Sequence, residues 1–207
     1  MATRQDTPKT DAAPPGRRKG EQPAMSAQDK SEFVPVAPFE MVIFGGTGDL
    51  ARRKLIPSLY HRFLDRQFDD KSRIIAVSRS ELSRDEYIAK ITEAFKTFHP
   101  KEPFYQGAWN NFCALIDYVP IDVMDEGSDW DALGKKLDDK HVRIFYLAMP
   151  PRMYAPICEG LDKAGLASKT SRVVLEKPIG TDFDSAAIIN NGVGAVFDEN
   201  RIYRIDH

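Results

Sequence analysis

The chain has 207 residues, 42% of them hydrophobic and 29% charged, which allows one sizeable globular domain. Its 29 basic and 31 acidic residues give a net charge of −2, so general attraction to nucleic acid or to an anionic membrane is excluded. We expect no membrane span, no secretory signal, no metal site and no disulfide framework, and the two cysteines, Cys113 and Cys158, suit a reducing cytoplasm.

Residues Met1–Phe39 differ in composition from the rest of the chain. They hold six of the 14 prolines and almost no large apolar residue before Phe33. Such a segment buries too little apolar surface to offset the entropy lost on ordering. We therefore predict a disordered tail over residues 1–39 and one domain over residues 40–207. A regulatory tail, or a true start at Met25, are the alternatives.

Beyond the tail, short apolar runs alternate with helical patterns. The predicted strands are Met41–Phe44, Arg73–Val77, Tyr118–Ile121, Val142–Leu147, Arg172–Leu175 and Arg201–Ile205. The predicted helices are Leu50–Arg66, Arg84–Phe98, Trp130–Asp138, Tyr154–Ala164 and Ser185–Phe197. This order predicts an α/β fold with a doubly wound, mostly parallel sheet. Pro120 cannot donate a ladder hydrogen bond, which predicts an edge or irregular position for the third strand.

A glycine-rich loop, Gly45–Ala51, follows the first strand directly. Gly46, Gly48 and Ala51 satisfy the G-x-G-x-x-G/A pattern of Rossmann dinucleotide-binding folds. Small residues permit a tight turn and a close approach of a pyrophosphate, and the N–H groups at the helix start face the anion. The cations Arg52–Lys54 oppose the helix dipole unless an anion or solvent is near them. The alternative is a tight turn with a solvated basic patch.

The second predicted strand is followed by Ser78, Arg79 and Ser80. NAD-specific folds usually carry an acidic residue here for the ribose hydroxyl, whereas an arginine suits the 2′-phosphate of NADP. A guanidinium group also matches phosphate geometry through two parallel donors. Arg79 therefore favours NADP as the cofactor. A plain surface arginine is the competing interpretation.

Four segments in family order resemble those of glucose-6-phosphate dehydrogenases. They are Phe44–Leu55 with Pro57–Tyr60, Phe145–Pro151, Glu176–Asp182 and Tyr203–His207. The resemblance implies a Rossmann-like coenzyme domain and hydride transfer from the anomeric carbon of β-glucose 6-phosphate to NADP. The product would be 6-phosphogluconolactone, in the first step of the oxidative pentose phosphate pathway.

The resemblance also implies a role for each matching residue. Coenzyme binding falls to Gly45, Gly46, Thr47, Gly48, Asp49, Leu50, Ala51 and Arg52 at the phosphates, to Arg79 at the 2′-phosphate, and to Asp122, Val123 and Tyr146 beside the coenzyme. Lys177 would contact coenzyme and sugar, Pro178 would be a cis proline, His207 would bind the sugar phosphate, and Asp206 would orient the catalytic histidine.

In the family, the pattern continues after the final histidine with Tyr-Leu-Gly-Lys and a second α+β domain that holds the general-base histidine. His61, His99 and His141 do not fit that role. We therefore expect a chain of these 207 residues alone to be inactive, and full-length members to form homo-oligomers. Two other interpretations are a non-catalytic NADP-binding module and an enzyme of related Glu-Lys-Pro type, such as a sugar dehydrogenase or oxidoreductase, acting on another substrate. The motifs Asp49–Lys54 and Arg204–His207 disfavour the latter.

Overall fold

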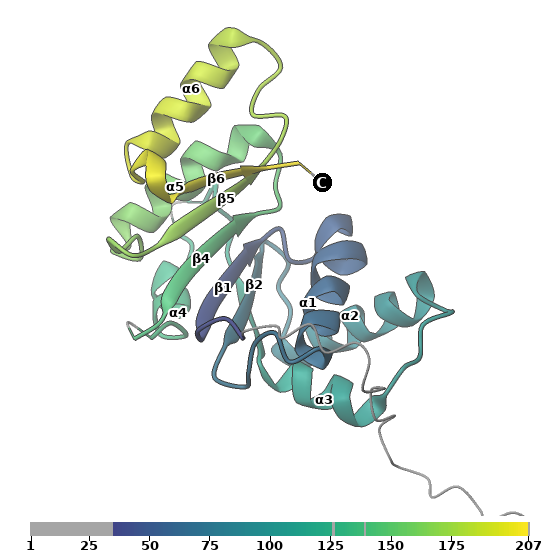
Figure 1. The fold of residues 1–207 in the computed structure, drawn as a ribbon. Coiled ribbons are helices and arrows are strands. Elements are labelled where there is room, and N and C mark those ends of the chain that lie inside the picture. Colours follow the sequence, from purple (N-terminus) through teal and green to yellow (C-terminus); the bar gives the residue numbers. More distant parts are fainter. Residues whose placement is uncertain (1–34, 126, 139, 207) are drawn as a thin grey trace, which may run out of the picture. The chain divides into compact units, whose positions relative to one another are not determined.

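The computed structural model describes residues 35–125, 127–138 and 140–206. Its strands are β1 (Phe39–Phe44), β2 (Arg73–Ser78), β3 (Ile116–Pro120), β4 (Val142–Leu147), β5 (Arg172–Glu176) and β6 (Ile202–Ile205). They form one parallel sheet in the order β3-β2-β1-β4-β5-β6 (Figure 1). This order confirms the predicted doubly wound Rossmann-like fold. Pro120 ends β3, and β3 is an edge strand as predicted.

Helices cover both faces of the sheet (Figure 1). The α-helices are α1 (Ile56–Leu64), α2 (Arg84–Phe98), α3 (Gln106–Ala114), α4 (Trp130–Gly134), α5 (Tyr154–Lys163) and α6 (Phe183–Gly194). A π-helical segment, η1 (Ala51–Leu55), precedes α1, and two 3₁₀ turns are η2 (Pro151–Met153) and η3 (Glu199–Arg201). None of the helices in the described ranges has the length and hydropathy of a membrane span.

The strand side chains divide between two hydrophobic cores. In β1, Val42 and Phe44 pack with residues of α4, α5 and α6, whereas Ile43 packs with residues of α1, α2 and α3. All three are fully buried, as expected for a parallel sheet covered on both faces. Because both faces are covered, polar groups can gather at the carboxyl ends of the strands.

The first strand begins two residues earlier than predicted, at Phe39 rather than Met41. The ring of Phe39 contacts the ring of Phe68, with the ring centroids 5.3 Å apart. Three residues earlier, the Val36 N–H donates to the Gln67 carbonyl at 2.9 Å. Residues 35–39 therefore contact the domain. The rest of the predicted tail lies outside the described residues and stays a prediction.

Helix α3 was not expected from the sequence. Its residues Gly107, Asn110 and Asn111 are poor helix formers and no side chain caps its start. Two buried aromatic residues, Trp109 and Phe112, hold it against α1 and β3, and the Trp109 indole N–H donates to Thr92 Oγ1 at 2.9 Å. Tertiary packing therefore forms this helix, which local propensity does not predict.

Two other helices differ from prediction at their ends. α4 stops at Gly134 rather than Asp138, so it is a little over one turn long. α6 begins at Phe183, two residues early, because Asp182 caps it and accepts the Ser185 N–H at 2.7 Å. It ends at Gly194 instead of Phe197.

Candidate dinucleotide-binding site

Close packing against the neighbouring strands β4 and β2 restricts which residues fit in the glycine loop. Gly45 has a φ of +85°, and a Cβ added there would lie 2.2 Å from the Ala148 carbonyl oxygen at the end of β4. A Cβ at Gly46 would lie 2.7 Å from the Ala76 Cβ in β2. The close approach of the neighbouring strands is thus a reason for glycine at these two positions, and the approach of a pyrophosphate to the loop stays a prediction.

The loop leaves four backbone donors available. The Gly45 and Gly46 N–H groups both donate to the Val77 carbonyl at 2.9 Å, and the Gly48 N–H donates to Gly45. By contrast, the N–H groups of Thr47, Asp49, Leu50 and Ala51 have no hydrogen-bond partner among the described residues. The first helical bond is donated by Arg52 to Gly48 at 3.1 Å. Free donors at a helix start favour an anion.

The helix after the loop contains the π-helical segment η1, where one continuous α-helix was expected. Pro57 has no N–H group, so the Arg53 carbonyl cannot receive its usual i+4 hydrogen bond. The Ile56 N–H donates instead to Ala51, five residues back. The freed Arg53 carbonyl lies 3.2 Å from His99 Nε2. A proline near the start of α1 thus changes the hydrogen bonding directly beneath the loop.

A cavity of about 570 Å³ opens at the carboxyl ends of the strands, where the sheet order reverses between β1 and β4. The loops after β1, β2, β3 and β4 all contribute to it. The residues that line it are Phe44, Gly45, Thr47, Gly48, Val77, Ser78, Arg79, Ile121, Asp122, Val123, Met124, Ala148, Met149, Pro150, Arg152, Met153 and Pro156. Apolar walls with a few polar groups suit an aromatic base joined to a phosphate.

Several predicted coenzyme residues meet in this cavity. Arg79 is exposed on its rim and has no hydrogen bond or ion pair with any described residue. Asp122 and Val123 line it after β3, and Ser128 Oγ braces Asp122 by donating to its carbonyl at 2.7 Å. Arg152, after β4, lines the same cavity and was missed. Its only sequence signal is a basic residue directly after the Pro150–Pro151 pair.

Tyr146 does not line this cavity. Its side chain is 7% exposed, and its hydroxyl donates to Glu176 Oε1 at 2.5 Å. Burial and then the hydrogen bond to this carboxylate raise the pKa of Tyr146 above its usual value, so the phenol stays neutral. Tyr154 also donates to the Glu176 carbonyl, at 3.1 Å. The predicted position of Tyr146 beside the coenzyme stays a prediction, and its observed contact is with Glu176.

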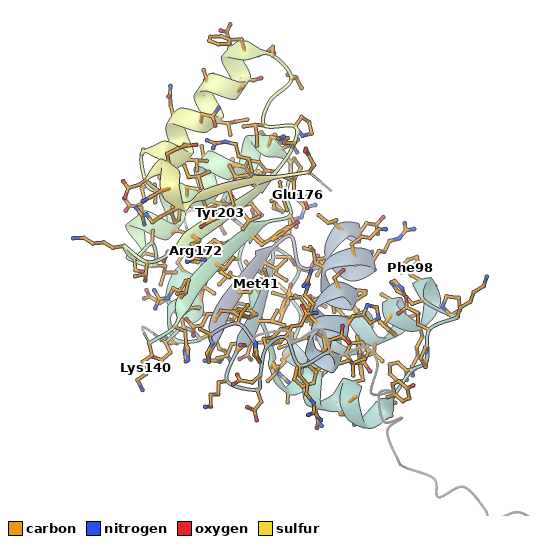
Figure 2. All side chains as sticks on the ribbon, in the orientation of Figure 1. Met41, Phe98, Lys140, Arg172, Glu176 and Tyr203 are labelled. Atoms are coloured by element: carbon orange, nitrogen blue, oxygen red, sulfur yellow. The ribbon has the colours of Figure 1, made fainter. Side chains whose placement is uncertain are left out.

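The predicted substrate residues gather at the ends of β5 and β6. Figure 2 shows Glu176 at the end of β5, and Lys177 follows it with a cis peptide bond to Pro178, as the resemblance implied. Lys177 Nζ lies 3.3 Å from Asp206 Oδ2, and the Lys177 N–H donates to Ile205 at 3.0 Å. His207 lies outside the described residues. Lysine and aspartate, 29 residues apart in sequence, thus form one exposed pair.

A larger cavity of about 920 Å³ lies between α4 and α5. Four carboxylates line it, Asp125, Asp129, Asp131 and Glu159. Lys163 lines it too, but its ammonium group lies 2.7 Å from Glu159. The remaining negative charge repels a phosphate. Size alone therefore does not identify the coenzyme site, and the smaller cavity at the glycine loop has the chemistry that a dinucleotide needs.

The three described histidines lie away from the Lys177–Asp206 pair. His61 Nε2 lies 2.6 Å from Glu102 Oε2, and His99 Nδ1 lies 2.8 Å from Glu102 Oε1. Burial alone would raise the pKa of Glu102, but its hydrogen bonds to His99 and His61 outweigh this and lower it below the ordinary 4.5. His141 precedes β4, at the opposite end of the strand from the cavity.

The strand order and the cavity define a dinucleotide-binding α/β domain. Residues 42–207 match the family described as "Glucose-6-phosphate dehydrogenase, NAD binding domain". The chain belongs to the glucose-6-phosphate dehydrogenase family, which confirms the resemblance.

Curated relatives and solved structures agree with this assignment. The chain is 47% identical over 178 residues to the glucose-6-phosphate 1-dehydrogenase of Gluconobacter oxydans, covering 84% of this chain and 36% of that protein. It is 42% identical over 179 residues to the enzyme of Rhizobium meliloti, covering 86% and 36%. The crystal structure from Mycobacterium avium is 34% identical with a TM-score of 0.74, covering 81% and 35%. The chain therefore spans about a third of these relatives.

A second solved structure is titled a glucose-6-phosphate dehydrogenase in complex with its substrate glucose-6-phosphate. It is 27% identical to this chain, with a TM-score of 0.70, and the match covers 83% of this chain and 38% of that one.

Proposed function

We propose that this chain binds NADP at the loop between β1 and the first helix, as the coenzyme domain of a glucose-6-phosphate dehydrogenase. The observation that carries the proposal is the set of four unpaired N–H groups, from Thr47 and from Asp49 to Ala51, beside the unpaired Arg79. Backbone donors at a helix start suit the pyrophosphate, and a free guanidinium suits the 2′-phosphate. The residues present therefore fit the coenzyme.

The cavity walls support the rest of the coenzyme. Ile121, Val123 and Met124 present apolar surface after β3, where an adenine ring would pack. Met149 and Pro150 line the side nearest β4. The bound nicotinamide would supply the hydride acceptor for oxidation of the anomeric carbon of glucose 6-phosphate. The protein's contribution at this site is to orient the ring and exclude water.

For the sugar, the proposal uses the exposed pair at the ends of β5 and β6. Lys177 is proposed to contact both the coenzyme and the sugar, because it follows β5 at the edge where ligands of such sheets bind. Asp206 is proposed to orient a base histidine, and His207 to bind the sugar phosphate. The presence of the Lys177–Asp206 pair favours an enzyme over a purely nucleotide-binding module.

We propose further that these 207 residues alone bind the coenzyme but do not oxidise glucose 6-phosphate. Among the described residues no histidine lies beside Lys177, since His61 and His99 are engaged with Glu102. Loss of a general base typically costs about 10² to 10⁴ in rate. The cytoplasm as location, suggested by two free buried thiols, and homo-oligomers in full-length proteins remain predictions.

A titration with NADP and with NAD tests the proposal. Replacing Arg79→Ala should weaken NADP binding about 10- to 150-fold, because a charge-assisted phosphate contact contributes about 1.5–3 kcal/mol. The same change should alter NAD binding by less than about twofold. Arg62→Ala is the control, since Arg62 bonds Gln67 near the far end of α1. A wild-type chain that binds neither nucleotide, or an Arg79→Ala variant that keeps its NADP preference, would contradict the proposal.

A further inference from the structure

Besides the cavities of about 570 and 920 Å³, a third cavity of about 260 Å³ adjoins the glycine loop. It lies between α2 and the start of the helix that follows the loop. The residues lining it are Thr47, Arg52, Ser80, Leu82, Tyr87 and Lys90. Two are cations, three carry hydroxyl groups and none is acidic. We call this the α2 cavity. Its charge contrasts with that of the 920 Å³ cavity, which four carboxylates line.

The two cations of the α2 cavity have unused binding capacity. Arg52 Nη2 donates to Asp49 at 3.0 Å, but Arg52 Nε is buried and has no hydrogen-bond partner among the described residues. Lys90 is exposed and attracts the carboxylate of Glu86, one helical turn away, but its ammonium group has no ion pair within 4 Å and no hydrogen bond in the described part of the chain. A buried donor without a partner is costly, so the described residues satisfy the Arg52 guanidinium only in part. The positive charges of Arg52 and Lys90 together favour an anion in this cavity.

The walls connect the α2 cavity to the coenzyme site. Thr47 lines both cavities, and its hydroxyl donates to Ser78 Oγ at 3.1 Å. Ser80 lines the α2 cavity immediately after Arg79, which lines the other. Tyr87 donates to the Gly46 carbonyl at 3.1 Å, and burial raises the pKa of its phenol, so it adds no negative charge. The segment after β2 thus separates two cavities that share one loop residue.

We propose that Lys90 of α2, together with Arg52, is a second set of cations that attracts the 2′-phosphate of NADP from the α2 cavity, which adjoins the coenzyme cavity that Arg79 lines. The inference rests on the proposed function and adds Lys90 as a residue that determines coenzyme specificity. A phosphate monoester dianion attracts all three cations, whereas the ribose hydroxyl of NAD attracts none of them strongly. Lys90 therefore selects NADP by charge and makes no contribution to NAD.

The test compares Lys90→Met with Lys54→Met. Both changes remove one exposed lysine, but Lys54 lies in η1 beside Arg52 and does not line the α2 cavity. Titrations would use NADP, NAD, 2′,5′-ADP and 5′-ADP on the chain as it stands. Lys90→Met should weaken NADP and 2′,5′-ADP about fivefold and leave NAD and 5′-ADP within about twofold. Lys54→Met should change all four by less than about twofold.

Two further measurements make the result decisive. Lys90→Arg should keep most of the NADP preference, and the loss in Lys90→Met should shrink in high salt as screening increases. The inference would be overturned if the ratio of NADP affinity to NAD affinity were the same in the wild type and in Lys90→Met. If Arg79→Ala loses the preference while Lys90→Met keeps it, only Lys90 is wrong. A wild-type chain that binds no NADP would overturn the proposed function as well.

Discussion

One face of the sheet is covered by helices at one end, over β1 to β3, and is partly exposed at the other end, at β6. Over β1, β2 and β3 it is covered by α1, α2 and α3, and the ring of Tyr60 lies 4.9 Å from that of Trp109 and 5.4 Å from that of Phe95. On β6 the same face carries Tyr203, opposite Val174, and Tyr203 is 43% exposed (Figure 2). At the same end of the sheet but on the opposite face, Phe183 and Ile188 of α6 are exposed at 86% and 69%.

The two proposed sites follow the same division. The coenzyme loop is held by close strand packing, with glycines fitted against Ala148 and Ala76. The Lys177–Asp206 pair stands in solvent, with side chains 52% and 77% exposed. Close packing thus surrounds the glycine loop proposed to bind the coenzyme phosphates, while the groups proposed to meet the sugar are exposed. From this comparison we expect coenzyme binding to depend mainly on the described fold, which is the proposal that the experiments below test.

A loss of stability as large as any other predicted below is expected at Gly45. Gly45→Ala combines a positive φ with a 2.2 Å approach to Ala148, so it should lower the free energy of unfolding by at least about 3 kcal/mol. Gly165→Ala is the matched control, because Gly165 has a φ of +68° but no atom within 4 Å of an added Cβ. It should cost only about 1 kcal/mol. Urea unfolding measures both, and equal losses would mean that β4 does not restrict the loop.

The next effect contrasts the two ends of the sheet. Trp109→Ala should cost about 3–5 kcal/mol, since Trp109 is 1% exposed and contacts four aromatic rings. Phe183→Ala should change stability by less than about 0.5 kcal/mol, because that ring is solvent-exposed. Thermal unfolding of both variants tests this. A large loss for Phe183→Ala would show that the α6 end is covered in solution.

The sequence predicted the parts of the fold that local patterns determine. β4 and α2 begin and end at the predicted residues, because an apolar run and a Ser83–Glu86 capping box mark them. α3 and the π-helical segment were missed, since one depends on tertiary packing of aromatic rings and the other on the hydrogen bond that Pro57 cannot donate.

The site follows the same rule. The glycine loop and Arg79 are adjacent to strand ends, so sequence spacing locates them. Lys90 lies 43 residues beyond Thr47, within a helix, and only packing of α2 against the loop brings it to the cavity. Tyr146 was predicted from resemblance, and its observed partner, Glu176, lies on the neighbouring strand. Contacts between segments that are far apart in the chain cannot be predicted from the spacing of residues along the sequence.

A smaller effect is expected from the Glu102 cluster beneath the loop. The pKa of Glu102 is lowered in the folded chain, so its ion pairs stabilise the fold above the ordinary value of 4.5 and are lost as pH falls through the lower folded value. Glu102→Gln should therefore cost about 0.5 kcal/mol at pH 6, a small value because the pair is over one-third exposed. The difference from wild type should shrink as the pH falls below 4.5. A difference that stays constant from pH 6 to pH 3 would contradict this.

The most direct test is to follow backbone amide resonances by NMR while NADP is added. The account predicts that the amides of Thr47, Asp49, Leu50 and Ala51 shift together and become protected from hydrogen exchange, because the pyrophosphate takes up their unpaired N–H groups. Shifts confined to the acidic cavity around Asp125–Asp131, with these four amides unchanged, would contradict it.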